Sequence, residues 1–178
     1  MSVISIILAA LALTLILIRA ARGNANKIGS VGDLAGFTQP MDLPAFLNLV
    51  DPDEEEFLRA NLTPKVFRNI QRERLIAATE YVRVAARNAA VLVQLGETAS
   101  VDANAEVSQI GHELVTASIR LRAFAFLALC LLYVRIAVPN TRLSLFRIPS
   151  RYQHVIEKTG HLVRLKEPAQ ASRILQFF

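Results

Sequence analysis

The chain has 178 residues, a net charge of +5 and a hydrophobic fraction of 53%, which is above the usual range for a globular protein. Its length fits one domain with an appendage and leaves enough chain to bury a core. The single cysteine, Cys130, excludes an intrachain disulfide and a cysteine-based zinc site. Because it lies within an apolar run, we expect it to be a small buried hydrophobe.

The first apolar segment, Ser2 to Ile18, contains no charged residue. As a helix it would be roughly 25 Å long, against a hydrocarbon core of about 30 Å. Small residues at positions 20 and 21 keep a cleaved signal peptide as the alternative, but a signal peptide carries its bases before the apolar stretch. We therefore expect residues 1–22 to form an uncleaved single-pass anchor in the cell inner membrane. Three bases after it predict an outer N-terminus and a cytoplasmic domain: Arg19, Arg22 and Lys27.

Residues 23–41 contain four glycines and show no sustained hydrophobic period. This composition predicts a flexible linker. A phosphate-binding loop is disfavoured because no strand precedes these glycines and no Lys-Ser or Lys-Thr pair follows them.

Three helix starts follow, each marked by a capping residue and a proline in the first turn. The caps are Asp42, Asp51 and Thr63. Six acids and no base occur between residues 42 and 56. We interpret the acid run as the start of a helix over 52–60, where acids suit the positive end of the helix dipole, rather than as a metal site or an acidic-partner site.

Two long amphipathic helices are predicted over 64–95 and 102–138, with Gly96 ending the first. The short connection makes them an elongated antiparallel hairpin with arms of about 48 and 55 Å, unless one arm kinks, for which Gly111 is a candidate. Such a shape suits a brace or a docking surface better than a closed catalytic pocket. The predicted seam between the helices consists of Leu75, Ala78, Val82, Ala85, Leu92, Val107, Ile110, Leu114, Leu121 and Phe124.

The run from Ala123 to Val134 has little polar face. It holds only twelve residues between Arg122 and Arg135, which is too short to cross a membrane. We expect it to be covered all round, either by the other helices of the chain or by another protein.

The last third of the chain is basic, with ten bases and two acids from Arg120 onward. Ser150 and Gln153 form a capping box that predicts a helix over 150–165. A basic surface suits anionic lipid or an acidic partner; nucleic acid is disfavoured because the bases are scattered and no aromatic stacking set accompanies them. The candidate contacts to a partner or to lipid are Arg142, Arg147, Arg151, Arg164, Arg173, Phe177 and Phe178.

Signals for chemistry are weak. His154, Glu157 and His161 share one face of the predicted C-terminal helix and could present metal ligands, but we favour a solvated polar face because Gly160 weakens the helix and no further ligand is identifiable. A proton relay between His112 and Glu113 is disfavoured, because adjacent residues point apart on a helix. No nucleophile motif surrounds the serines. We expect no enzyme activity, no cofactor and no small-molecule substrate.

The sequence thus predicts an all-α protein with an anchor over 1–22, a linker over 23–41 and a helical-bundle domain over 42–178. We expect a non-enzymatic accessory or structural subunit that braces a larger bacterial membrane protein complex, with photosynthetic and respiratory energy-converting complexes as candidate hosts. The alternative is a membrane-tethered helical adaptor that binds a soluble partner or an anionic lipid surface through its basic C-terminal third.

Overall fold

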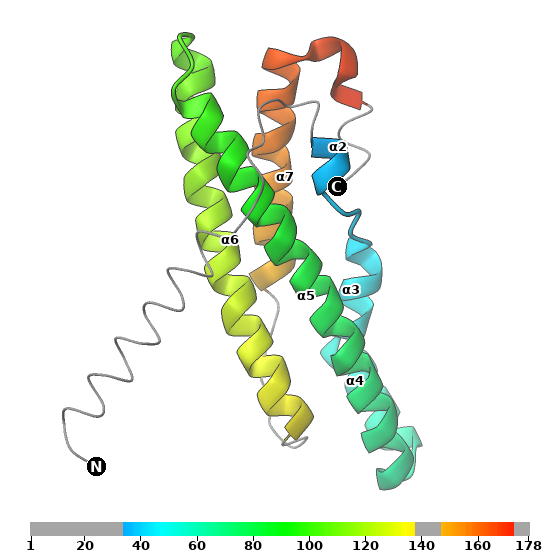
Figure 1. Cartoon of the computed structure of the whole chain (residues 1–178). Helices are drawn as coiled ribbons and strands as arrows, with labels where there is room; N and C mark the ends of the chain where they lie inside the picture. Colours follow the sequence, from blue (N-terminus) through cyan, green and yellow to red (C-terminus); the bar gives the residue numbers. More distant parts are fainter. Residues whose placement is uncertain (1–33, 138–146, 173–178) are drawn as a thin grey trace, which may run out of the picture.

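The computed structural model describes residues 34–137 and 147–172, and these residues are helical with no strand among them (Figure 1). The prediction of an all-α helical bundle is confirmed. The predicted anchor over 1–22 lies outside the described residues. The elements are α2 (Leu34–Phe37), α3 (Leu43–Leu49), α4 (Pro52–Asn61), α5 (Pro64–Ser100), α6 (Ala105–Ala137), α7 (Arg147–Lys166) and the 3-10 helix η2 (Pro168–Gln170).

Helices α5 and α6 form a long hairpin, and the other elements pack along it (Figure 1). Asp42 caps α3 by accepting a hydrogen bond from the Ala45 N–H at 2.9 Å. Asp51 caps α4 through the Asp53 N–H at 3.1 Å. Thr63 precedes α5 without a side-chain capping bond. The three predicted helix starts are therefore confirmed.

The predicted helix end at Gly96 is wrong, because α5 continues to Ser100. A Cβ atom on Gly96 would lie 2.8 Å from Val115 Cγ2 and 2.9 Å from the Gly111 carbonyl oxygen. Helix α6 likewise runs unbroken through Gly111, where a Cβ atom would lie 2.5 Å from the Ser100 backbone nitrogen. Gly96 therefore does not end α5 and Gly111 does not kink α6. Both glycines permit the backbones of the two helices to approach closely.

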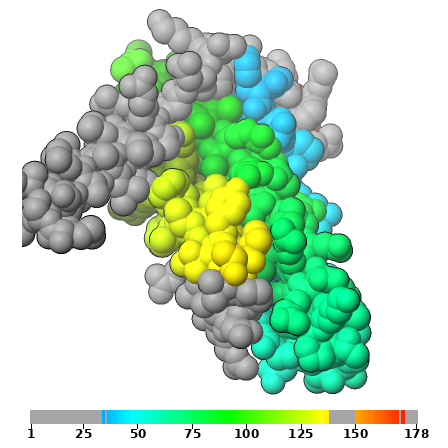
Figure 2. All heavy atoms as spheres, turned by 60° about the horizontal axis from the view of Figure 1, so that its bottom comes forward, coloured from blue at the N-terminus to red at the C-terminus, as the bar shows by residue number. Residues whose placement is uncertain are grey.

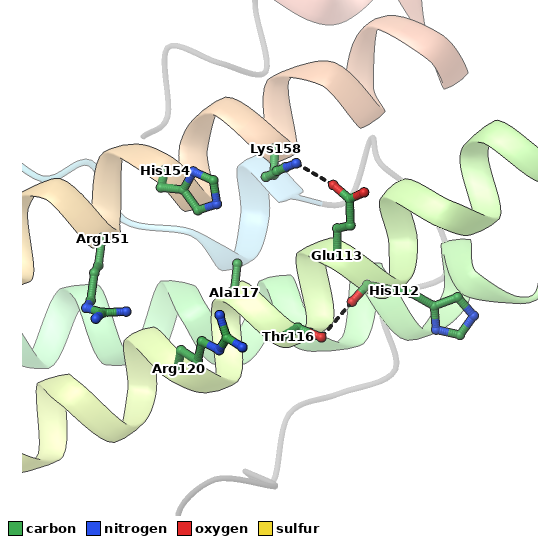
Figure 3. A pocket seen from close by; sticks show the side chains of 8 residues that line it. All are labelled: His112, Glu113, Thr116, Ala117, Arg120, Arg151, His154 and Lys158. Atoms are coloured by element: carbon green, nitrogen blue, oxygen red, sulfur yellow. Dashed lines mark hydrogen bonds and ion pairs between the residues drawn. The ribbon is translucent and has the colours of Figure 1, made fainter.

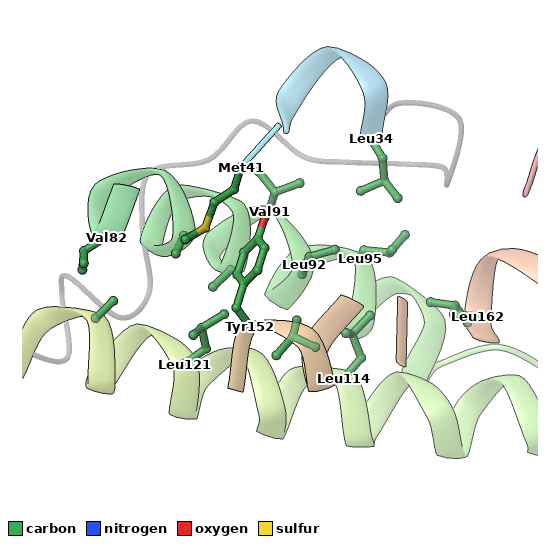
Figure 4. Packing of buried hydrophobic residues seen from close by; sticks show 14 of the residues in the cluster. Leu34, Met41, Val82, Val91, Leu92, Leu95, Leu114, Leu121, Tyr152 and Leu162 are labelled. Carbon is green, nitrogen blue, oxygen red and sulfur yellow. The ribbon is translucent and has the colours of Figure 1, made fainter. Parts of the chain in front are cut away.

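The core lies along the inner faces of α5 and α6 and is completed by Tyr152 from α7, which reaches toward Met41 (Figure 4). Every residue of the predicted seam is buried except Phe124, which is half-buried. The buried cluster combines small side chains on α5, such as Ala78 and Ala85, with large ones on α6, such as Leu121, as interdigitating helices require.

The structure differs from the linker expected over 23–41 in its last eight residues. Leu34 and Met41 are buried in the core. Gln39 is fixed to α5, since its N–H donates to Asn88 Oδ1 at 2.9 Å and its carbonyl accepts from Asn88 Nδ2 at 2.7 Å. Leu34 and Met41 lie seven residues apart, but Gly36 and Pro40 interrupt the pattern between them, so this short segment resembles a linker in the sequence. Residues 23–33 lie outside the described part of the chain.

Asn88 is fully buried and also donates to the Tyr152 hydroxyl at 2.8 Å. Tyr152→Phe is expected to lower the free energy of unfolding by about 1 kcal/mol, because it removes one partner of a buried amide. Chemical denaturation followed by circular dichroism measures this loss. Tyr133→Phe is the control, since Tyr133 meets Arg83 on the exposed surface. An equal loss in both variants would contradict a special role for the buried bond.

Helix α7 begins at Arg147, so Ser150 lies inside it and the predicted capping box is wrong. Pro149 lies in the first turn of α7, where a helix tolerates proline. At its other end α7 reaches the start of α6, where Lys166 Nζ lies 2.8 Å from Asp102 Oδ2. This pairing aligns α7 with the first half of α6.

Candidate functional site

Helix α7 covers only the first half of α6. Its contacts run from Asp102, which pairs with Lys166, to Phe124, whose ring lies under the Arg151 guanidinium. Beyond Phe124 the outer side of α6 is left open among the described residues. In Figure 2 this end of α6 forms a continuous part of the surface beside α5.

The side of α6 opposite α5 carries a stripe of exposed apolar residues spaced three or four apart, which begins before Phe124 and which we call the α6 apolar face. Leu127 is 52% exposed and Val134 is 48% exposed. Residues at this spacing share one side of a helix, and the stripe is about 27 Å long at 1.5 Å per residue. Its members are Ile119, Ala123, Leu127, Cys130, Val134 and Ala137.

The prediction that Cys130 is buried is wrong. Cys130 is exposed, because it lies opposite the side of α6 that contacts α5. The described helices do not cover the run 123–134 all round, since Ala125, Ala128 and Leu132 face the core while Leu127 does not. Coverage of the remaining side by another protein stays a prediction. By length and composition, α6 is the one helix among the described residues that could cross a membrane, a property that core helices share.

Arg135, which follows the apolar run 123–134, lies in an ionic cluster where α4, α5 and α6 meet. Its guanidinium is 2.6 Å from Glu55 Oε2 and its side chain is 8% exposed. Glu55 also accepts hydrogen bonds from Gln71 at 3.0 Å and from Arg59 at 3.0 Å. Burial raises the pKa of Glu55, but the hydrogen bonds and charges of Arg135 and Arg59 outweigh it and leave the pKa below its usual value.

Arg74 joins the same end of the hairpin, bonding to Glu54 Oε2 at 2.9 Å and to the Asn48 carbonyl at 2.7 Å. The acids of α4 therefore do more than start a helix, because two of them hold arginines of α5 and α6. The sequence contains one indication of this cluster: Arg135 interrupts an apolar stretch of the helix, and acids without a base occur between residues 42 and 56. It could not show that positions 55 and 135 meet.

A cleft with a volume of about 360 Å³ lies between α6 and α7 (Figure 3). Its one acid, Glu113, is paired with Lys158, and the hydrogen bonds from Lys158 and Gln109 lower the pKa of Glu113. The Arg151 guanidinium lies 3.7 Å from the centroid of the Phe124 ring. The lining residues are His112, Glu113, Thr116, Ala117, Arg120, Arg151, His154 and Lys158.

The histidines are placed differently from one another. Both His112 and His154 border the cleft, but the His112 side chain points away from the other labelled side chains (Figure 3). His154, Glu157 and His161 are exposed on α7, and within 34–137 and 147–172 no group of three His, Cys, Asp or Glu residues is arranged to hold a metal.

Of the predicted partner contacts, Arg151 stacks on Phe124 and Arg164 is exposed. Arg147 begins α7, but its side chain is outside the described part. The remaining predicted contacts and flanking bases also lie outside the described residues: Arg19, Arg22, Lys27, Arg142, Arg173, Phe177 and Phe178.

Comparison with known proteins gives no match, whether to a family model, a curated protein or a solved structure.

Proposed function

We propose that this chain is a non-enzymatic, membrane-attached accessory subunit that docks onto a larger bacterial membrane protein complex through the α6 apolar face. The observation that carries the proposal is the length and continuity of this exposed stripe. Single exposed apolar residues are ordinary on a protein surface. A contiguous apolar stripe on a folded domain marks an interaction site.

The chemistry of the face suits the packing of a partner helix. Small residues at positions 123, 130 and 137 alternate with large ones at 119, 127 and 134, which gives the ridges and grooves that packed helices use. The uncharged segment Ser2 to Ile18 supports attachment to the inner membrane, with the helical domain on the cytoplasmic side. A membrane protein is therefore the partner we propose, and energy-converting complexes are candidate hosts.

The test is to isolate the full chain from native membranes in mild detergent and to identify every chain in the complex. We expect a discrete assembly that contains this chain at a fixed ratio. Val134→Glu should remove the partner, because it places a charge in the apolar contact. Val101→Glu is the matched control, since Val101 is 83% exposed at the turn of the hairpin.

Both variants should retain the circular dichroism spectrum of the parent chain, because both positions are exposed. A lone monomer or dimer from native membranes would contradict the proposal. Equal recovery of the partner with Val134→Glu and Val101→Glu would show that another surface makes the contact.

The alternative function is a membrane-tethered adaptor that uses its basic surface, and the cleft between α6 and α7 is the observation that favours it. In that case binding to vesicles of anionic lipid should weaken as salt is raised. The Val134→Glu variant would then bind these vesicles as the parent chain does.

A further inference from the structure

Two arginines face the cleft between α6 and α7 without an acidic partner in its lining. Arg120 reaches from α6 toward α7, and Arg151 reaches from α7 toward α6 (Figure 3). The lining acid, Glu113, is already paired with Lys158. The cleft therefore holds an excess of positive charge among its described lining residues, and an anion between the two guanidinium groups would relieve their repulsion.

Arg151 is held in place before any ligand arrives. Its guanidinium stacks on Phe124, with 3.7 Å between Cζ and the ring centroid. Stacking occupies the flat face of the group and leaves its N–H edge for hydrogen bonds in the guanidinium plane. A planar fork of N–H donors matches two oxygens of one phosphate.

His154 adds a ring nitrogen from the turn of α7 that follows Arg151. The volume of about 360 Å³ lies near the lower end of the range for small-molecule sites, about 300–1,000 Å³. The cleft is thus large enough for a phosphate with a small substituent.

We propose that this cleft binds a phosphate group between Arg120 and Arg151, with His154 as a third polar contact. The proposal goes beyond the docking role above, because the cleft and the α6 apolar face are different surfaces. The phosphate could belong to a lipid headgroup or to a soluble phosphate compound, since both present the same oxygens to the arginines.

The experiment uses the full chain in a neutral detergent at low salt. Inorganic phosphate and a short-chain phosphatidic acid are titrated separately, and binding is measured by calorimetry. Arg120→Gln and Thr116→Glu should each weaken binding at least about tenfold, because the first removes a charge-assisted hydrogen bond and the second places a carboxylate in the cleft. Arg72→Gln is the matched control, because Arg72 is exposed on α5.

Arg151→Gln should also weaken phosphate binding, but this variant removes the stacking on Phe124 as well. Thr116→Glu tests the cleft without changing that contact.

Similar binding of both probes would support a soluble phosphate compound as the source. Binding of phosphatidic acid alone would support a lipid headgroup. The proposal is overturned if neither probe binds, or if Arg120→Gln and Thr116→Glu bind as tightly as Arg72→Gln.

Discussion

Gly111→Ala is expected to lower the free energy of unfolding by about 2 kcal/mol. The new Cβ atom would lie 2.5 Å from the Ser100 nitrogen, 2.8 Å from the Ala99 carbonyl carbon and 2.9 Å from the Gly96 carbonyl oxygen. All three are backbone atoms, which cannot rotate away, so the two helices must separate. Overpacking of this kind costs about 1–3 kcal/mol or more, which exceeds the gain of about 1 kcal/mol in helix propensity.

Urea unfolding followed by circular dichroism measures this loss. Gly36→Ala is the matched control, because nothing lies within 4 Å of the Cβ position there. That variant should be as stable as the parent chain, or more stable by up to about 1 kcal/mol. Gly111→Leu should destabilise further than Gly111→Ala. If Gly111→Ala and Gly36→Ala were equally stable, the helix crossing would not be as close as the structure has it.

Glu55→Gln is expected to cost about 3 kcal/mol at pH 7. It removes the carboxylate that lies 2.6 Å from Arg135 and also accepts from Gln71. Removing one partner of a buried ion pair costs about 3–5 kcal/mol, and the 17% exposure of the Glu55 side chain favours the lower end. Glu56→Gln, at an exposed neighbouring position, should change stability by less than about 0.5 kcal/mol.

The effect of Glu55→Gln should depend on pH. The folded state lowers the pKa of Glu55 below its ordinary value of 4.5, so the carboxylate stabilises the fold above pH 4.5. This stabilisation is lost as the pH falls through the lowered pKa, because the folded chain must then take up a proton. The difference in stability between the parent chain and Glu55→Gln should therefore shrink in acid. A difference that stays constant from pH 7 to pH 3 would contradict the ionic explanation.

The sequence predicted those parts of the fold that depend on neighbours in the chain. The starts of α3, α4 and α5 follow from a capping residue beside a proline, and both signals act within one helical turn. The hairpin follows from a hydrophobic period that persists over 30 residues. These signals are local, and they hold whatever else the chain contacts.

The parts that the sequence missed depend on which distant residues meet. Glycine often ends a helix, so Gly96 suggested a helix end from its local sequence. In the structure Gly96 instead lets the backbone of α6 at Gly111 come close to α5. Cys130 has apolar neighbours, yet it is exposed because it lies on the side of α6 opposite α5. The cleft that holds Arg120 and Arg151 requires the register of α6 against α7, which no spacing within either helix specifies. Tertiary packing decided each of these features.

Asn88 also constrains the order in which the domain can form during synthesis. Its amide bonds to Gln39, 49 residues earlier, and to Tyr152, 64 residues later. Residues 34–41 leave the ribosome first, but this polar centre has all its partners only after position 152 has emerged. The bonds between Gln39 and Asn88 need only α5, so they can form before α7 has been synthesised. The buried amide of Asn88 gains its last partner, the Tyr152 hydroxyl, only when α7 packs against the hairpin.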